Sequence, residues 1–218
     1  MKEDQRTDIE EENRVVLERL EELKKNMRTT YNKKVILDKE LRPLLGNTIT
    51  DFMIKNGFCS APASTIHHGN YEGGLFEHSL TVALCLQKYT DRLGLSWEKA
   101  DSPIRIGMLH DLCKIDSYKK VIDRPEAFDI ETLSTDPEEF HYEYDSSPII
   151  KGHGDKSVIY ALRYGCLLTE EEIACITYHM GAFTDKERWK DYSSAIKKHP
   201  NVLFTHTADM EASQIYGC

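Results

Sequence analysis

Imidazole and carboxylate side chains occur along this chain in an order that could bind a metal ion. His110 and Asp111 are adjacent inside the apolar segment GMLHDLCK. Burying both groups is costly unless they are paired or ligate a metal. His78 lies in GGLFEHS and Asp209 in HTADME, each in a segment expected to be helical. Because neutral imidazole and carboxylate suit divalent first-row metals, these residues predict a metal site.

Two further histidines occur in similar settings. His153 lies in KGHGDKS, just before an expected helix, and His179 lies in TYHMG, at an expected helix C-terminus that Gly181 could cap. Taken alone, a His-Asp dipeptide is typical of an ordinary helix, but suitable donors in several separate segments favour a shared centre. The predicted ligands are His78, His110, Asp111, His153, His179 and Asp209.

The order of these residues resembles the H…HD…D signature of the HD-domain superfamily of metal-dependent phosphohydrolases. The strings HHGNYEGGLFEHS, LHDLCKID, KGHGDKS and YHMG are similar to the catalytic domain of Gram-positive 3′-to-5′ exoribonucleases, and to small HD hydrolases of Firmicutes and their phages. The similarity covers residues 50–215. An acidic helix replaces the OB-type nucleic-acid-binding domain of the exoribonucleases. The HDxxED motif of guanosine tetraphosphate hydrolases and the GYP motif of cyclic-di-GMP hydrolases are absent from the sequence.

The resemblance implies two ligand groups that share Asp111. The first metal would be held by His78, His110, Asp111 and Asp209. The second would be held by His153, His179 and Asp111. We therefore expect one or two divalent ions as cofactor, with Mn, Fe, Co, Ni, Mg and Zn all suited to such donors. Two metals about 3.5–4 Å apart can activate water and stabilise charge in an in-line phosphoryl displacement. Glu77 or Asp116 could orient the imidazoles from outside the ligand shell.

Several residues beside these ligands could bind substrate. In the resemblance, Lys114 is placed to contact substrate phosphate, whereas a solvated helix lysine is the alternative. Lys156 could contact phosphate too, with the same alternative. His68 could approach the substrate from a Gly-rich loop, although a plain loop is equally consistent with that segment. Tyr118 opens a polar stretch whose tyrosines could stack on a substrate or donate hydrogen bonds to it.

Hydrophobic periodicity predicts a mostly α fold, an HD-domain helical bundle with one polar insertion or small β-hairpin. Residues 1–46 are expected to form a charged helix and connector, and 47–218 the hydrolase domain. A hairpin is expected around YKKVI and EEFHYEY. The predicted helices cover 4–28, 47–57, 75–93, IRIGMLHDLCKI after Pro103, 155–165, the segment from the Thr169 capping box to Met180, and 201–215.

Composition limits the partners. The chain has 218 residues, 28 Lys and Arg against 37 Asp and Glu, and a net charge of −9. Such acidity opposes general binding to nucleic acid, which depends on cationic contacts to phosphate. The six cysteines form no CxxC pair, and neither a signal peptide nor a membrane span is evident, so we expect reduced thiols, a cytoplasmic protein and no membrane partner. The apolar stripe of the N-terminal helix could pack on its own domain or support a homodimer.

Three functions follow as hypotheses. The first is hydrolysis of a small phosphorylated substrate, such as a nucleotide, which the acidity and the missing nucleic-acid domain favour. The second is a 3′-to-5′ nuclease or other phosphodiesterase on short single strands, which the string similarity favours. The third is a non-enzymatic metal-binding sensor, which intact ligands oppose because buried unused ligands would be destabilising.

Overall fold

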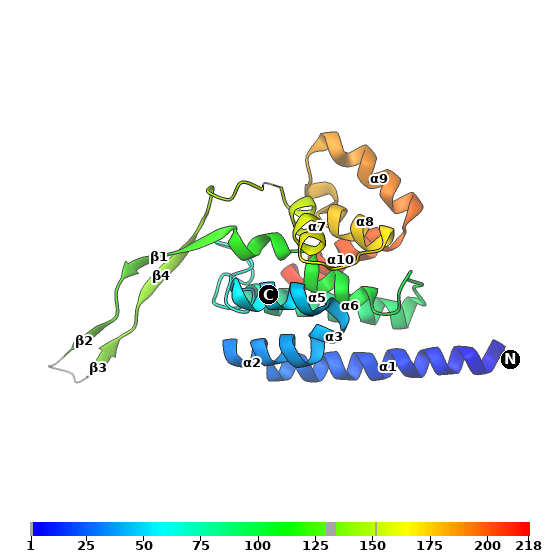
Figure 1. The fold of residues 1–218 in the computed structure, drawn as a ribbon, viewed down its shortest axis with the longest axis horizontal. Helices are drawn as coiled ribbons and strands as arrows, with labels where there is room; N and C mark the ends of the chain where they lie inside the picture. Colours follow the sequence, from blue (N-terminus) through cyan, green and yellow to red (C-terminus); the bar gives the residue numbers. More distant parts are fainter. Residues whose placement is uncertain (1, 130–133, 151) are drawn as a thin grey trace.

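The computed structural model describes residues 2–129, 134–150 and 152–218. A mostly helical body carries a two-stranded β arm that extends away from it (Figure 1). This confirms the predicted mostly α fold with a small β-hairpin. The α-helices are α1 (Lys2–Asn26), α2 (Thr30–Ile36), α3 (Arg42–Leu45), α4 (Asn47–Lys55), α5 (Gly74–Leu93), α6 (Ser102–Leu109), α7 (Gly154–Arg163), α8 (Glu170–Tyr178), α9 (Trp189–Lys198) and α10 (Asn201–Gln214). Short 3-10 or π-helical turns are η1 (Leu37–Leu41), η2 (Leu112–Asp116), η3 (Gly181–Phe183) and η4 (Lys186–Arg188).

Helix α5 lies at the centre of the body. It packs against α1, α6 and α10, and most of its residues from Gly74 to Gln87 are buried. A helix that is apolar around most of its circumference needs neighbours on all sides. Helix α5 is therefore the scaffold on which the surrounding elements are aligned.

Helix α1 packs along α5 (Figure 1). Its apolar stripe repeats at helical spacing, and Leu20, Leu23 and Met27 are buried in the same core cluster as the residues of α5. The apolar stripe of this helix therefore packs within its own chain.

One expected helix is interrupted. The segment after Pro103 was expected to continue as a helix through His110 and Asp111, but α6 ends at Leu109 and the 3-10 turn η2 begins at Leu112. Asp111 has φ −105° and ψ 18°, outside helical geometry. Consecutive residues of a regular α-helix point about 100° apart, so the break lets His110 and Asp111 face the same centre.

The β arm confirms the predicted hairpin. Strand β1 (Tyr118–Arg124) pairs antiparallel with β4 (Glu139–Tyr144), and β2 (Ala127–Asp129) pairs with β3 (Ser134–Asp136) further out. Because directly opposed residues share a face of the ribbon, one face has an aromatic character. We call this the aromatic face; it consists of Tyr118, Lys120, Ile122, Phe140, Tyr142 and Tyr144.

Several local predictions are confirmed and others were missed. The Thr169 capping box is present, with the Thr169 hydroxyl accepting from the Glu172 backbone and the Glu172 carboxylate accepting from the Thr169 backbone. Helices α2, α3 and α9 were not predicted. Helix α9 has no fully buried residue among those the structure describes, and its apolar side chains Tyr192, Ala195 and Ile196 pack only partly buried against the core.

All six cysteines are free and buried, as expected for small apolar side chains. Among the described residues, none of the helices is both long and apolar enough to span a membrane.

Candidate metal centre

Five elements bring the six predicted ligands to one place. Helix α5 carries His78, the end of α6 carries His110 and Asp111, α10 carries Asp209, and the remaining two histidines flank helix ends. His153 precedes α7 and His179 follows α8. The imidazoles of His78, His110 and His179 are fully buried, whereas the side chains of Asp209 and His153 are 16% and 35% exposed. The cluster is therefore open to solvent on the side of Asp209 and His153.

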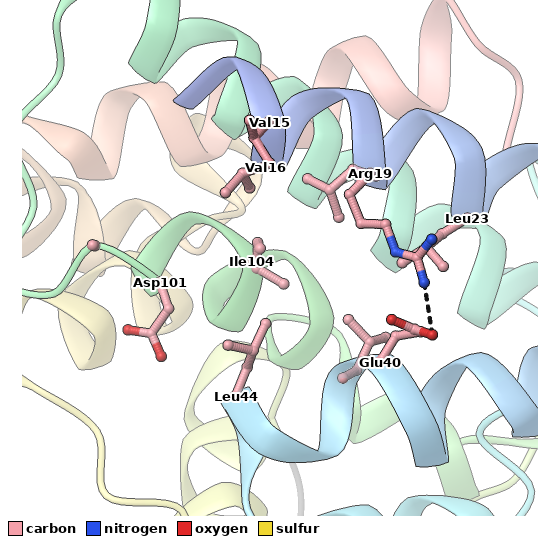
Figure 2. Close-up of a pocket in the computed structure, with 11 residues that line it drawn as sticks. Val15, Val16, Arg19, Leu23, Glu40, Leu44, Asp101 and Ile104 are labelled. Carbon is pink, nitrogen blue, oxygen red and sulfur yellow. Dashed lines mark ion pairs between the residues drawn. The ribbon is translucent and has the colours of Figure 1, made fainter. Parts of the chain in front are cut away.

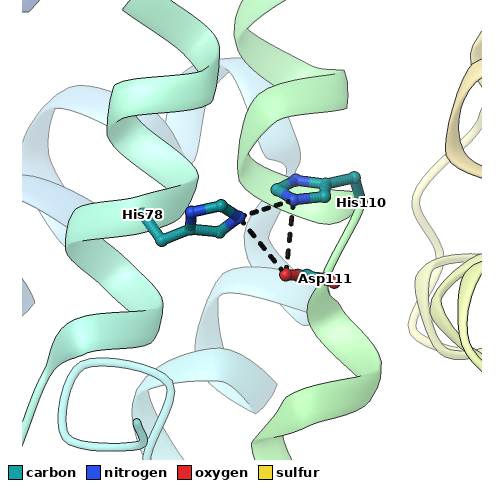
Figure 3. A group of neighbouring side chains, drawn as sticks. All are labelled: His78, His110 and Asp111. Atoms are coloured by element: carbon teal, nitrogen blue, oxygen red, sulfur yellow. Dashed lines mark hydrogen bonds and ion pairs between the residues drawn. The ribbon is translucent and has the colours of Figure 1, made fainter. Parts of the chain in front are cut away.

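The first group surrounds Oδ2 of Asp111. The Nε2 atoms of His78 and His110 each lie 3.4 Å from Oδ2 and 3.1 Å from each other (Figure 3). Oδ1 of Asp209 lies 3.1 Å from Nε2 of His78 and 3.9 Å from that of His110. The donor atoms come from three elements, and those of His78, His110 and Asp111 all lie within 4.8 Å of one another.

The second group surrounds the other oxygen of the same carboxylate. Nε2 of His153 lies 2.9 Å from Oδ1 of Asp111, and Nε2 of His179 lies 3.5 Å from it. His179 is also within 4.8 Å of donor atoms of His110 and Asp209, so the two groups form one continuous shell. The Asp111 carboxylate joins them.

The donor set fits a divalent metal. Oδ1 of Asp111 and Nε2 of His179 are buried and make no hydrogen bond within the described residues. When several donor atoms face a common ion, they lie close together but do not point at one another in hydrogen-bond geometry. Metal bonds of about 2.0–2.1 Å would place neighbouring donors about 3.0–3.4 Å apart, close to the separations observed. The cluster could therefore hold a metal ion, and its mixed nitrogen and oxygen donors do not select one metal.

The far nitrogen of each histidine is held by the protein. Nδ1 of His78 donates to the carbonyl of Cys218 (2.9 Å), that of His110 to Gly107 (2.9 Å) and that of His179 to Ile176 (2.7 Å). Such bonds place the proton on Nδ1 and leave the Nε2 lone pair facing the centre. Nδ1 of His153 lies 3.5 Å from Sγ of Cys113.

These contacts correct one prediction. Glu77 and Asp116 were expected to orient the imidazoles, but backbone carbonyls and a thiol occupy those positions. Asp116 instead accepts hydrogen bonds from Lys156 and Tyr160, each 2.5 Å long. Backbone acceptors carry no signature in side-chain type, so they could not be found from sequence.

Charges in the centre are strongly coupled. Burial disfavours the ionised form of Asp111, but Lys114, His110 and His153 outweigh burial and hold its pKa well below the usual range. Burial also opposes protonation of His78 and His153, yet the neighbouring groups, Asp111 among them, raise their pKa values to about 9 and about 10. A bound metal would replace these protons as the counter-charge to the carboxylates.

Two of the predicted substrate residues lie beside the cluster. Nζ of Lys114 is 2.6 Å from Oδ2 of Asp111, and the lysine side chain is 10% exposed. The ring of His68 is 5.2 Å from that of His78. Burial, with His78 and Lys114 nearby, lowers the pKa of His68 to about 4, so its imidazole is neutral.

The other two predicted substrate residues, Tyr118 and Lys156, lie in different environments. Tyr118 is partly buried, and burial raises its pKa while Lys114 opposes the shift. Lys156 is 3% exposed, and its ammonium group forms an ion pair with Asp116. Nδ1 of His206, on α10, donates to the carbonyl of His179 (2.7 Å).

Two glycines allow the ligand-bearing helices to approach. A Cβ on Gly107 of α6 would lie 2.4–2.6 Å from atoms of Ala83 on α5, the helix of His78. A Cβ on Gly154 would lie 2.4–2.5 Å from the carbonyl oxygens of Ile176 and Thr177, just before His179. Each close approach brings together a pair of imidazoles, and sequence inspection missed both.

Four pockets of the described part of the chain lie outside the ligand cluster. One of about 350 Å³ lies between α1, α6 and the η1–α3 segment, with apolar walls and an Arg19–Glu40 ion pair at 2.8 Å (Figure 2). None of the six predicted ligands lines it. A smaller pocket of about 270 Å³ lies at the root of the arm, where Ile115, Tyr118, Lys120 and Tyr142 meet the loop before α5. Ile115, which lines this second pocket, immediately follows Lys114 in the chain.

Comparison with protein-family models, with curated proteins and with solved structures finds no match for this chain.

Proposed function

We propose that this protein is a metal-dependent phosphohydrolase of the HD-domain type, acting on a nucleotide or another small phosphate ester. The observation that carries the proposal is the Asp111 carboxylate, whose two oxygens face separate pairs of imidazole Nε2 atoms. The sequence resemblance supports the same reading. When bound, divalent ions in such a site supply Lewis acidity and activate water for attack on phosphorus.

The chain's own residues complete the proposed site. Lys114 carries a positive charge at the edge of the ligand shell, where its ammonium group would bind a phosphoryl oxygen. Asp111 remains ionised because its pKa is well below the usual range. His68 is neutral beside His78 and can exchange a hydrogen bond with substrate or water. The open side at Asp209 and His153 would admit the phosphate group.

The pocket at the arm root would take the remainder of the substrate. Ile115, the residue after Lys114, lines this pocket together with Tyr118 and Tyr142. Its small volume, about 270 Å³, suits a single ring system rather than a polymer. The proposed substrate is therefore compact, with a phosphate at the metal centre and a planar group against the tyrosines.

A phosphate-release screen tests this proposal. The protein would be assayed with nucleotides and bis-p-nitrophenyl phosphate across Mn, Fe, Co, Ni, Mg and Zn, with Asp111→Ala as the matched inactive chain. We expect metal-dependent turnover that the variant lacks. Metal binding without turnover on any substrate would instead favour the sensor hypothesis.

One observation favours the phosphodiesterase alternative. The aromatic face of the arm continues outward from Tyr118 to Ile122 and Phe140, and Lys120 lies 4.0 Å from the Phe140 ring centroid. Exposed aromatic rings can stack successive bases of a single strand. The arm's excess of acidic residues opposes that use. Stepwise shortening of single-stranded RNA, with nucleotides left intact, would decide for this alternative.

A further inference from the structure

Two residues of the C-terminal segment contact the His78 imidazole, one at each ring nitrogen. Asp209 of α10 places Oδ1 3.1 Å from Nε2 of His78, and Cys218 places its carbonyl oxygen 2.9 Å from Nδ1 of the same ring. The two residues are nine apart in one continuous segment. His78 is fully buried and therefore has no access to water as a substitute acceptor.

The turn after α10 is built to return the chain to His78. The backbone N–H groups of Ile215 and Tyr216 both donate to the carbonyl of Glu211, and that of Cys218 donates to Ala212. Gly217 adopts φ +71°, a left-handed conformation that side chains other than glycine disfavour. Cys218 is 3% exposed, so the end of this turn is seated in the protein interior.

From this geometry we infer that the backbone oxygen of Cys218 is a positioning group for metal binding, and that tight binding requires residues 215–218 to be seated. The inference rests on the proposed metal site. An acceptor at Nδ1 fixes the tautomer in which Nε2 offers its lone pair, and it also fixes the orientation of the ring. If the turn is displaced, His78 can rotate or place its proton on Nε2, and the first ligand group loses a donor. By reciprocity, a bound metal should stabilise the seated turn.

Cobalt(II) binding to the full-length chain tests the inference, followed by calorimetry and by the visible absorption of the ion. Gly217→Pro cannot adopt φ +71° and should unseat the turn while leaving every predicted ligand in place. Loss of such supporting contacts typically weakens metal affinity about 10–100-fold, and we expect a decrease of that size with an altered cobalt spectrum. Ile215→Ala, at a side chain 76% exposed, is the matched control in the same turn.

Three further measurements distinguish a positioning role of the Cys218 backbone from a role of its thiol or a general loss of stability. Cys218→Ala keeps the carbonyl and removes only the thiol, so equal weakening by this variant would overturn the inference in favour of thiol packing against Thr81. Unfolding temperatures in EDTA measure what each change costs the fold, and both variants should be fully folded at the temperature of the cobalt titration. Amide exchange of 215–218 should slow when cobalt binds the unmodified protein.

The inference and the proposed function fail in different ways. If Gly217→Pro binds cobalt as tightly as the unmodified protein, the positioning role is wrong while the metal site stands. If the unmodified protein itself binds no divalent metal, the proposed function fails and the inference fails with it.

Discussion

The metal centre and the β arm are built in opposite ways. The centre collects six side chains from five elements, and the imidazoles of His78, His110 and His179 are fully buried. The arm uses neighbouring residues of two paired strands, and its side chains are mostly exposed, with Tyr144 61% and Ile122 45% accessible. The metal centre is held in place by the packing of the whole helical body, whereas the arm is held mainly by the hydrogen bonds between its own paired strands.

The difference separates two tasks. Donor atoms around a metal must hold their positions to within a fraction of an ångström, which packed helices can ensure. An isolated two-stranded hairpin is only marginally stable in water, so the arm cannot supply that precision. It can supply exposed aromatic surface next to the centre. Changes in the centre should therefore alter metal binding, and changes in the arm should alter substrate binding alone.

The largest effect is expected for Asp111→Ala. This change removes the carboxylate whose two oxygens face both histidine pairs. We expect hydrolysis to disappear and metal affinity to fall by more than the roughly 10–100-fold typical of an outer-shell change. Metal content and turnover measure the result, with Asp123→Ala on the arm as a carboxylate control. Near-full turnover with metal bound would show that Asp111 is merely structural.

A smaller effect is expected for Gly107→Ala. The added methyl group would meet Ala83 at 2.4–2.6 Å and force α6 away from α5. Overpacking of this kind typically costs about 1–3 kcal/mol of the free energy of unfolding. Because His78 and His110 lie on these helices, metal affinity should fall as well. Denaturant unfolding in EDTA and metal titration measure the two effects; unchanged affinity in the variant would show that the helix spacing does not set the site.

The arm should behave differently when its tyrosines are removed. We predict that Tyr118→Ala, Tyr142→Ala and Tyr144→Ala together raise KM about tenfold or more, because stacking is worth about 1–3 kcal/mol per base. Metal content should be unchanged, since none of the three is a ligand. Steady-state kinetics with the substrate identified by the screen measure this. Unaltered KM would assign substrate choice to the loop at 58–74.

The smallest effect is expected at the outer part of the aromatic face. Ile122→Ala and Phe140→Ala remove side chains that are 45% and 38% exposed. Exposed substitutions of this kind usually change the free energy of unfolding by less than about 0.5 kcal/mol. Thermal unfolding and cobalt titration should both match the unmodified protein. A marked loss of stability would mean that the arm packs on the body more than its exposure indicates.

The sequence by itself predicted the helical class, the hairpin and the six residues of the cluster. Hydrophobic periodicity was sufficient to predict α5, because its apolar positions are dense. The Thr169 capping box could be identified because its two residues are only three apart in the sequence. Helix α9 was missed although Tyr192, Ala195 and Ile196 follow helical spacing, because this apolar pattern covers little more than one turn and none of the three residues is fully buried.

The tertiary structure decided which residues contact one another and how the ligands are oriented. The break after Leu109, the close approach at Gly107 and the return of the chain to Cys218 depend on contacts between segments far apart in the sequence. The ammonium group of Lys156 pairs with Asp116, which lies 40 residues earlier in the chain, and sequence alone did not indicate this pair. Residue type and spacing indicate which groups can bind a metal, because that is a property of each side chain. The orientation of those groups is set by backbone carbonyls and packing distances. Every residue has a backbone carbonyl, so the sequence does not show which carbonyl will lie beside which histidine; only the folded structure does.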